Sequence, residues 1–308
     1  MLQAVCPTPL IAMIKRSFFK SKYLPYLLIF PQMAVTLTFF YWPAIQGIIQ
    51  SFLLSDPFGQ RSTFVWFYNY IQLFTDPLYL GSIFTTFVFS IAVAAVSISW
   101  GLLIAVMANR VLKVKALTRT LLIWPYAVAP AISGIMWLFL LHPSYGIVAL
   151  GIKRWLGVDW NPVLYGHDAM AMIVVASAWK QISYNFVFFM AGMQAIPKSL
   201  IEAAAIDGAG PFKRFWFISF PLLSPTFFFL TVMNIIYSFF ETFGIIHTVT
   251  QGGPGGSTNI LVYKVYQDGF VGLNLGSSAA QSVVLMSLII VITFLQFRFV
   301  EKKVQYGG

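Results

Sequence analysis

Polar side chains inside apolar stretches are the residues of this chain whose types and spacing suggest chemistry. Thr231, Asn234, Ser238 and Glu241 follow one another at intervals of three or four residues, which places them on one stripe of a helix. An earlier apolar stretch carries a second group, namely Ser177, Lys180, Gln181, Tyr184 and Asn185. Such groups either line the path of a polar solute or join helices through hydrogen bonds. Both hypotheses stand for both groups.

Lys180 is the one cation within the predicted spans. An ammonium there is a candidate partner for a phosphate group, and equally for a carboxylate on a partner subunit. The sequence leaves open whether Lys180 acts in transport or in structure.

Patterns of catalytic, metal or nucleotide sites are missing from the sequence. The single Cys6 excludes an internal disulfide and a cysteine-based zinc site. His142, His167 and His247 are far apart and lie near the ends of apolar stretches. The glycine-rich segment Gly252–Ser257 lacks the lysine with which a Walker A loop binds phosphate. We therefore expect no catalytic residue, metal or cofactor on this chain.

The composition indicates which elements position these residues. Hydrophobic residues make up 59% of the 308 residues and charged residues only 9%, whereas a soluble domain carries about 25% charged residues. Uncharged apolar runs of about 20 residues cross the hydrocarbon core as helices. The runs lie near Leu24–Leu54, Ile83–Met107, Thr120–Leu141, Ala169–Met193, Ile218–Ile246 and Ser278–Phe297. The sequence therefore predicts an all-α membrane protein with six spans.

Basic residues sort to one side of these spans. The side of the two termini holds 14 of the 19 Lys and Arg residues, against four on the other side. Because basic loops stay in the cytoplasm, we expect both termini to be cytoplasmic. The net charge of +10 is thereby explained by the lipid bilayer, and we expect no nucleic acid partner.

The connection between the fourth and fifth predicted spans carries the most specific pattern. Ser199 with Glu202 three residues later is typical of a capping box, which predicts a helix from Ser199. Gly208 and Gly210 suit a left-handed helix end, and Pro211 cannot continue the helix. The result is a helix, a glycine turn and a second helix on the cytoplasmic surface. Its apolar face would pack either into a groove of a partner protein or onto lipid headgroups, and the sequence fits both hypotheses.

This segment also resembles the "EAA" signature of binding-protein-dependent importer permeases, in its fuller form Glu-Ala-Ala-x-x-Asp-Gly-Ala. One residue departs from this signature: Phe220 stands before the closing Pro221, where leucine is usual. The matching residues are Glu202, Ala203, Ala204, Asp207, Gly208, Ile218 and Pro221. Further stretches, 179–186, 191–197, 252–254 and 279–282, are similar to the carbohydrate-uptake branch of that family.

The resemblance implies one permease subunit of an ATP-driven importer in the bacterial inner membrane. Its partners would be a second homologous permease, two copies of a cytoplasmic ATPase that binds ATP and Mg²⁺, and a periplasmic binding protein. The helix that begins at Ser199 would be the coupling helix that docks into the ATPase. Residues 125–130 and 179–210 resemble permeases that take up sn-glycerol-3-phosphate, which implies that solute or glycerophosphodiesters.

Two other functions stay as alternatives. One is a permease for a neutral sugar or oligosaccharide, and the other is a secondary transporter driven by an ion gradient. The resemblance also implies three regions: residues 1–76 with the first span, a permease core at 77–297, and a cytoplasmic tail at 298–308.

Overall fold

The computed structural model describes residues 23–56, 61–110 and 116–300. The predicted all-α class is confirmed, apart from one small β-hairpin. In the first half of the chain the elements are α1 (Leu24–Thr36), η1 (Leu37–Tyr41), α2 (Trp42–Gln50), β1 (Leu53–Ser55), β2 (Ser62–Phe64), α3 (Tyr68–Thr75), α4 (Pro77–Arg110), α5 (Ala116–Ala127), α6 (Pro130–Leu141) and α7 (Ile147–Leu156). In the second half they are α8 (Gly166–Ala195), α9 (Lys198–Ile206), α10 (Pro211–Arg214), η2 (Phe215–Ser219), α11 (Phe220–Leu222), α12 (Ser224–Phe240), α13 (Phe243–Val249), α14 (Leu261–Tyr266), η3 (Gln267–Val271), α15 (Leu275–Leu295) and η4 (Gln296–Val300).

The chain divides into two compact units at Ile49 and Gln50. The first unit contains α1, the π-helical turn η1 and most of α2, which join into one apolar helical segment of 27 residues, Leu24–Gln50. At 1.5 Å per residue this length spans about 40 Å. No residue in these three elements is buried. The π-helical turn precedes Pro43, whose missing N–H interrupts the regular helical ladder.

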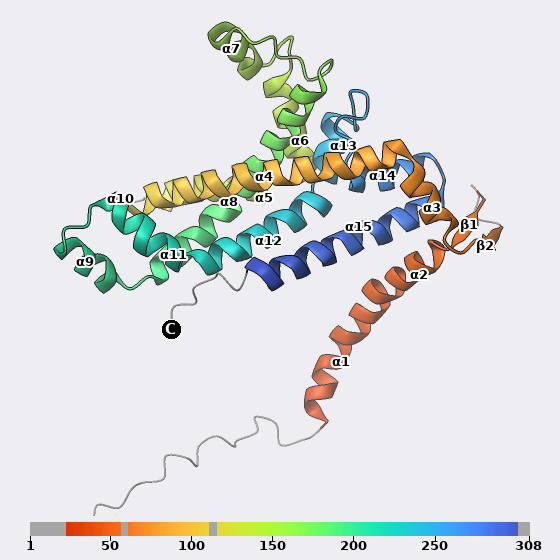
Figure 1. The fold of residues 1–308 in the computed structure, drawn as a ribbon, viewed down its shortest axis with the longest axis horizontal. Coiled ribbons are helices and arrows are strands. Elements are labelled where there is room, and N and C mark those ends of the chain that lie inside the picture. The colour runs from red at the N-terminus through yellow and green to blue at the C-terminus, as the bar shows by residue number, and fades with distance from the viewer. Residues whose placement is uncertain (1–22, 57–60, 111–115, 301–308) are drawn as a thin grey trace, which may run out of the picture. The chain divides into compact units, whose positions relative to one another are not determined.

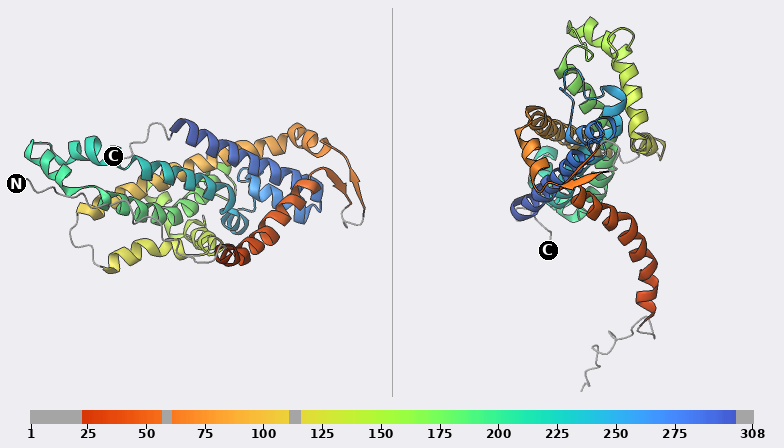
Figure 2. Two further views of the ribbon diagram at one scale, coloured as in Figure 1. Left: turned by 90° about the horizontal axis from the view of Figure 1, so that it is seen from below. Right: turned by 90° about the vertical axis from the view of Figure 1, so that its right-hand side faces the viewer.

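The second unit is a helical bundle centred on α8 (Figure 1). This helix packs against α4, α5, α6, α12 and α13. One core cluster surrounds Phe89, Ile173 and Tyr237, and another surrounds Phe186 and Leu230. Between apolar helices in lipid, close packing rather than expulsion of water holds such contacts together. Figure 2 shows α9 and α10 at the end of this bundle opposite the hairpin.

The close approach of α4 to α8 depends on one glycine. A Cβ atom built on Gly101 would lie 2.6 Å from the Cβ atom of Asn185 and 3.3 Å from the carbonyl oxygen of Ile182. These distances leave no room for a side chain. Gly101 therefore sets the spacing of the two longest helices in the bundle.

Two of the predicted spans are broken, which corrects the sequence-based picture. The third consists of α5 and α6, whose axes differ by 107°, and the fifth is interrupted by a bend of 65° before α12. Pro130 is the first residue of α6 and Pro225 is the second residue of α12, because proline starts a helix more easily than it continues one.

Among the described residues, three helices are long and apolar enough to cross a membrane: Leu24–Gln50, Pro77–Asn109 and Leu275–Phe299. Counting each bent pair as one span raises the number to five. The remaining predicted span, the fourth at Ala169–Met193, corresponds to α8, a helix of 30 residues. Its central polar residues, among them Lys180, Gln181 and Asn185, lower its hydropathy below that of the other spans. The count of six is therefore not confirmed by helix length and composition.

Candidate functional sites

The helix α9 is the element that carries the Glu-Ala-Ala segment. It starts at Lys198 and ends at Ile206. The amide of Gly208 donates to the Ala205 carbonyl at 3.1 Å, and that of Ala209 donates to the Ala204 carbonyl at 2.9 Å. These two bonds form a Schellman motif, which needs a left-handed residue after the helix. Gly208 supplies it with a φ of +79°, as the sequence predicts.

Two local predictions for this segment are wrong. The capping box does not form, because Pro197 occupies the N-cap and Ser199 lies one position inside the helix. Gly210 is not left-handed, since its φ is −67° and it precedes α10 in an extended conformation. One glycine therefore ends α9, and the second only leads into Pro211.

The surface of α9 is mostly exposed, and only Ile201 and Ala204 are half-buried. No residue of the helix is buried, and Ile206 is 87% exposed. Glu202 and Ala203 are also exposed. Within the described part of the chain, the apolar residues Leu200 and Ile206 therefore stay exposed.

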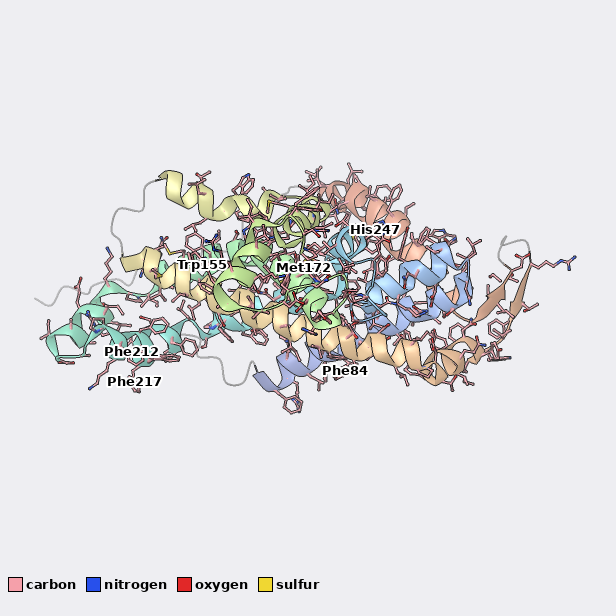
Figure 3. The ribbon with its side chains drawn as sticks, turned by 90° about the horizontal axis from the view of Figure 1, so that it is seen from above. Phe84, Trp155, Met172, Phe212, Phe217 and His247 are labelled. Carbon is pink, nitrogen blue, oxygen red and sulfur yellow. The ribbon has the colours of Figure 1, made fainter. Side chains whose placement is uncertain are left out.

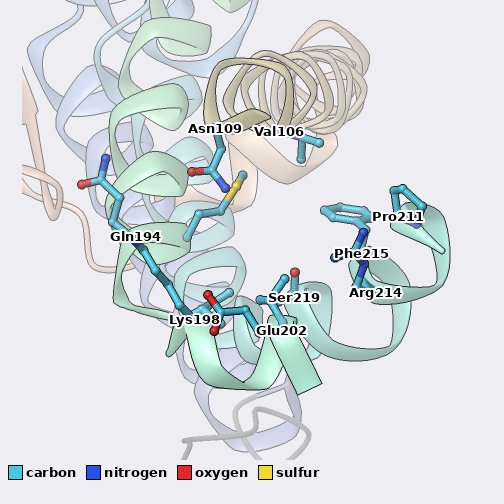
Figure 4. A pocket seen from close by; sticks show the side chains of 12 residues that line it. Val106, Asn109, Gln194, Lys198, Glu202, Pro211, Arg214, Phe215 and Ser219 are labelled. Carbon is cyan, nitrogen blue, oxygen red and sulfur yellow. The ribbon is translucent and has the colours of Figure 1, made fainter. Parts of the chain in front are cut away.

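A cavity of about 600 Å³ lies behind α9, at the ends of α4 and α8 (Figure 4). Glu202 and Lys198 line one wall, and Arg214 and Phe215 line another. The Nε atom of Arg214 is buried and has no hydrogen-bond partner within the described residues. The cavity thus separates the carboxylate of α9 from the membrane-embedded bundle.

The two predicted polar stripes meet at Asn185 and Asn234. The Asn234 amide nitrogen donates to the Asn185 side-chain oxygen at 2.8 Å, and Asn185 donates back at 3.3 Å. The Ser97 hydroxyl donates to the same oxygen of Asn234 at 2.7 Å. All three side chains are fully buried. This network joins α4, α8 and α12, and it is the arrangement expected of polar groups that connect helices in a membrane.

Ser97 was not identified from the sequence. It lies 137 positions before Asn234, and serines within an apolar run do not indicate which of them has a distant partner. Only the packing of α4 on α12 brings the two together.

Lys180 lies at the break between α5 and α6. Its Nζ atom donates to the carbonyl oxygen of Val128, and to that of Tyr126 at 3.4 Å. These carbonyls belong to the end of α5, where a helix leaves acceptors without partners and where positive charge is favourable. The Lys180 side chain is only 5% exposed. In this structure the ammonium therefore donates hydrogen bonds to the backbone carbonyls at the end of α5.

Aromatic rings on α8 support the same break. Trp179 packs edge-on against Trp124 of α5 and Trp137 of α6, with ring centroids 6.0 and 6.1 Å apart. Tyr184 packs on Tyr126 at 5.4 Å. One face of α8 therefore holds both halves of the bent pair.

The remaining predicted residues lie in different surroundings. The side-chain oxygen of Gln181 is buried without a hydrogen-bond partner in the described chain. Ser238 is buried and donates to the Asn234 carbonyl at 2.8 Å. Thr231 lines an apolar groove between α4 and α12. Glu241 is exposed at the end of α12 and lies within electrostatic range of Lys180. The described residues contain no cluster of three His, Cys, Asp or Glu that could hold a metal.

Comparison with known proteins decides the family. The model of the family described as "Binding-protein-dependent transport system inner membrane component" matches residues 97–306. The chain belongs to this family.

Relatives of the permease are similar over nearly their whole length. The sn-glycerol-3-phosphate transport system permease protein UgpA of Rhizobium meliloti (strain 1021) is 57% identical, over 96% of this chain and 100% of the relative. The protein of the same name from Yersinia pestis bv. Antiqua (strain Antiqua) is 52% identical, over 94% of this chain and 98% of the relative. Membership in this family argues against the ion-gradient transporter.

A solved structure shares the fold of the permease. A chain from the crystal structure of a bacterial alginate ABC transporter, in complex with an alginate pentasaccharide-bound periplasmic protein, aligns with a TM-score of 0.77. The alignment covers 93% of this chain and 96% of the other, at 20% identity. At that identity the likeness supports the fold alone.

Proposed function

We propose that this permease forms half of the transmembrane pathway of an ATP-driven importer for sn-glycerol-3-phosphate or glycerophosphodiesters. The observation that carries the proposal is the 57% identity to a permease of that name over 96% of the chain. Both termini lie in the cytoplasm, in agreement with the distribution of basic residues.

The importer divides its work among several chains. A second homologous permease completes the pathway, two copies of an ATPase bind ATP and Mg²⁺ in the cytoplasm, and a periplasmic binding protein delivers the solute. The permease itself hydrolyses nothing. The structurally similar alginate ABC transporter was solved in complex with a solute-bound periplasmic protein, which supports such an assembly.

Coupling runs through α9 in this proposal. An exposed short helix with a carboxylate at its centre fits a groove that offers a basic residue. The contact involves Ser199, Glu202 and the alanines 203 and 204, with Asp207 and Gly208 shaping the helix end. Pro221 terminates the same motif within α11. Motion of the ATPase would reach the bundle through the segment from Pro211 to Leu222.

The solute pathway runs along α8 and α12 in this proposal. The residues proposed to line it are Lys180, Gln181, Asn185, Thr231, Asn234, Ser238 and Glu241. Asn185 and Asn234 are bonded to each other in this structure, so they reach the solute only where α8 and α12 separate. Alternating access provides such a separation, because the walls of the pathway move between its two open states.

The test of the solute is uptake by the assembled importer in vesicles loaded with ATP. We expect labelled sn-glycerol-3-phosphate to accumulate, and glycerophosphodiesters to compete while maltose and maltotriose do not. Uptake of the labelled oligosaccharide instead would replace the proposal with the neutral-sugar permease. One observation favours that second candidate: the ammonium of Lys180 is directed at backbone carbonyls rather than at an open cavity.

The orientation is tested with reporter fusions at Gly255 and Lys303. We expect the first to report the periplasm and the second the cytoplasm. If both report one side, the proposed orientation is wrong.

A further inference from the structure

The helical segment Pro211–Leu222 has two chemically different faces. Arg214, Phe215 and Ser219 point toward the cavity behind α9. Outside the cavity lining, the segment exposes Phe212, Lys213, Trp216 and Phe217, which we call the aromatic face. Phe212 is 72% exposed and Phe217 is 78% exposed, and both lie on the outer edge of the segment (Figure 3).

The direction of this segment follows from the bend before α12. The axes of Pro211–Leu222 and Ser224–Phe240 differ by 65°. If α12 runs along the membrane normal, the segment lies at about 25° to the membrane plane, the complement of that bend. Membrane helices are tilted by about 20° on average, so the segment remains far from a spanning direction. A helix of this inclination at the end of a span lies at the membrane surface.

The composition of the aromatic face matches that location. Trp and Phe are the residues that enter the boundary between headgroups and acyl chains, while Lys on the same helix binds anionic headgroups. The exposed side chains of α9 differ, since they include the acid Glu202, small alanines and the aliphatic Leu200 and Ile206, but no aromatic residue. The two consecutive helices therefore present different surfaces to different partners.

We propose that the aromatic face binds the anionic surface of the cytoplasmic leaflet and thereby holds α9 at a fixed height below the bilayer. This interaction extends the proposed function, whose orientation places this end of the bundle in the cytoplasm. The bilayer also explains why three large aromatic side chains stay exposed on one face: lipid covers them. In this proposal the ATPase contacts α9 and not the aromatic face.

The test compares two exposed residues on the consecutive helices. In a Cys6→Ser background, Phe217→Cys and Ile206→Cys are labelled with a nitroxide, and the full importer complex is placed in nanodiscs of phosphatidylcholine with phosphatidylglycerol. Collision with oxygen reports lipid, and collision with a water-soluble nickel chelate reports water. We expect the label at position 217 to favour oxygen and the label at 206 to show no such preference.

Two outcomes overturn the proposal. Free access of the nickel chelate to position 217 would place the face in water. Loss of both collisions at 217 in the full complex, with both present in the complex prepared without the ATPase, would assign the face to the ATPase. Neither readout requires transport, so a wrong solute assignment leaves this test intact, and a failed test leaves the solute assignment intact.

The role of the lysine is tested separately. Lys213→Gln should weaken the binding of phosphatidylglycerol to the complex by about five-fold, the effect of one basic residue at an anionic surface. The matched control is Lys153→Gln on the exposed outer helix α7, which should leave binding in nanodiscs unchanged. Equal lipid binding by the Lys213 variant and the unsubstituted protein would contradict the proposed headgroup contact.

Discussion

The helices α8 and α9 follow one another along the chain, yet they use polar and apolar residues in opposite ways. α8 buries 15 of its 30 residues, including Lys180, Gln181 and Asn185. α9 buries none of its nine, and it exposes Ile206 together with Glu202. Lys180 and Asn185 hydrogen-bond to other elements of the bundle, whereas Leu200 and Ile206 of α9 are exposed in the described part of the chain. Changes in α8 should therefore affect the fold, and changes in α9 should affect association with another subunit.

The largest expected effect belongs to Glu202→Lys. A charged group at an interface costs about 2–5 kcal/mol when its pairing is broken, so uptake by the importer should fall at least about ten-fold. Membrane insertion and thermal stability should stay unchanged, since Glu202 is exposed. The measurement is co-purification of the ATPase together with solute uptake.

The control for that change is Asp159→Lys, which reverses an equally exposed carboxylate near α7. Its surface pair with Lys153 contributes little to stability. If both variants transport normally, the comparison between α8 and α9 fails at its strongest point.

Gly101→Val tests the buried side of the comparison. Side-chain atoms forced between α4 and α8 should destabilise the bundle by about 1–3 kcal/mol, which would appear as a lower unfolding midpoint in detergent and a lower yield of folded protein. Gly81→Val is the matched control on the same helix, because nothing lies within 4 Å of a Cβ built there. Equal midpoints for the two variants would show that α4 and α8 do not approach as described.

Gly208→Ala should act on α9 alone. A side chain in the left-handed region costs about 1–2 kcal/mol, which would unwind the Schellman end and weaken ATPase association by roughly five- to thirty-fold. Gly210→Ala should have no effect, since its backbone is extended and its surroundings are open. A common loss of association in both variants would point to crowding of the loop rather than to the turn.

The smallest effect is expected between Asn185 and Asn234. Hydrogen bonds between membrane helices couple by about 0.6 kcal/mol on average and by up to about 1.7 kcal/mol. Asn185→Leu and Asn234→Leu should each lower the unfolding midpoint, and the double variant should lose less than the sum of the two. Strictly additive losses would mean that the bond carries no energy. Unchanged uptake by a stable Asn234→Leu protein would remove Asn234 from the solute pathway.

Local features of this chain were predictable from the sequence. The end of α9 at Gly208 depends on residues within a few positions, so the glycine and the following Pro211 suffice to locate it. The capping box failed for an equally local reason, because Pro197 takes the N-cap that Ser199 was expected to occupy. The stripe of Asn234 and Ser238 was also correct as a helical periodicity.

Features that depend on helix packing were not predictable. The carbonyl acceptors of Lys180 could not be assigned from the sequence, because they become free only where α5 ends. Pro130 indicates a break in the span, but it predicts neither the 107° angle nor the helix that donates hydrogen bonds to the free carbonyls. Asn234 was expected on one surface with Glu241, whereas packing buries the first and leaves the second exposed. Periodicity defines a face of a helix, and the neighbouring helices decide what that face contacts.

The hydrogen bonds from Lys180 to the carbonyls at the α5–α6 break have a consequence for the order of membrane insertion. During synthesis α5 and α6 leave the ribosome before α8 exists, and the carbonyls of Tyr126 and Val128 then lack their donor. An unsatisfied carbonyl in hydrocarbon costs several kcal/mol, and a bare ammonium inserted alone is costly as well. The bent pair α5–α6 and the helix α8 are thus each unfavourable in the membrane until the other is present. The bent pair and α8 should enter the bilayer as one late unit, held at the insertion machinery until residue 180 has been made.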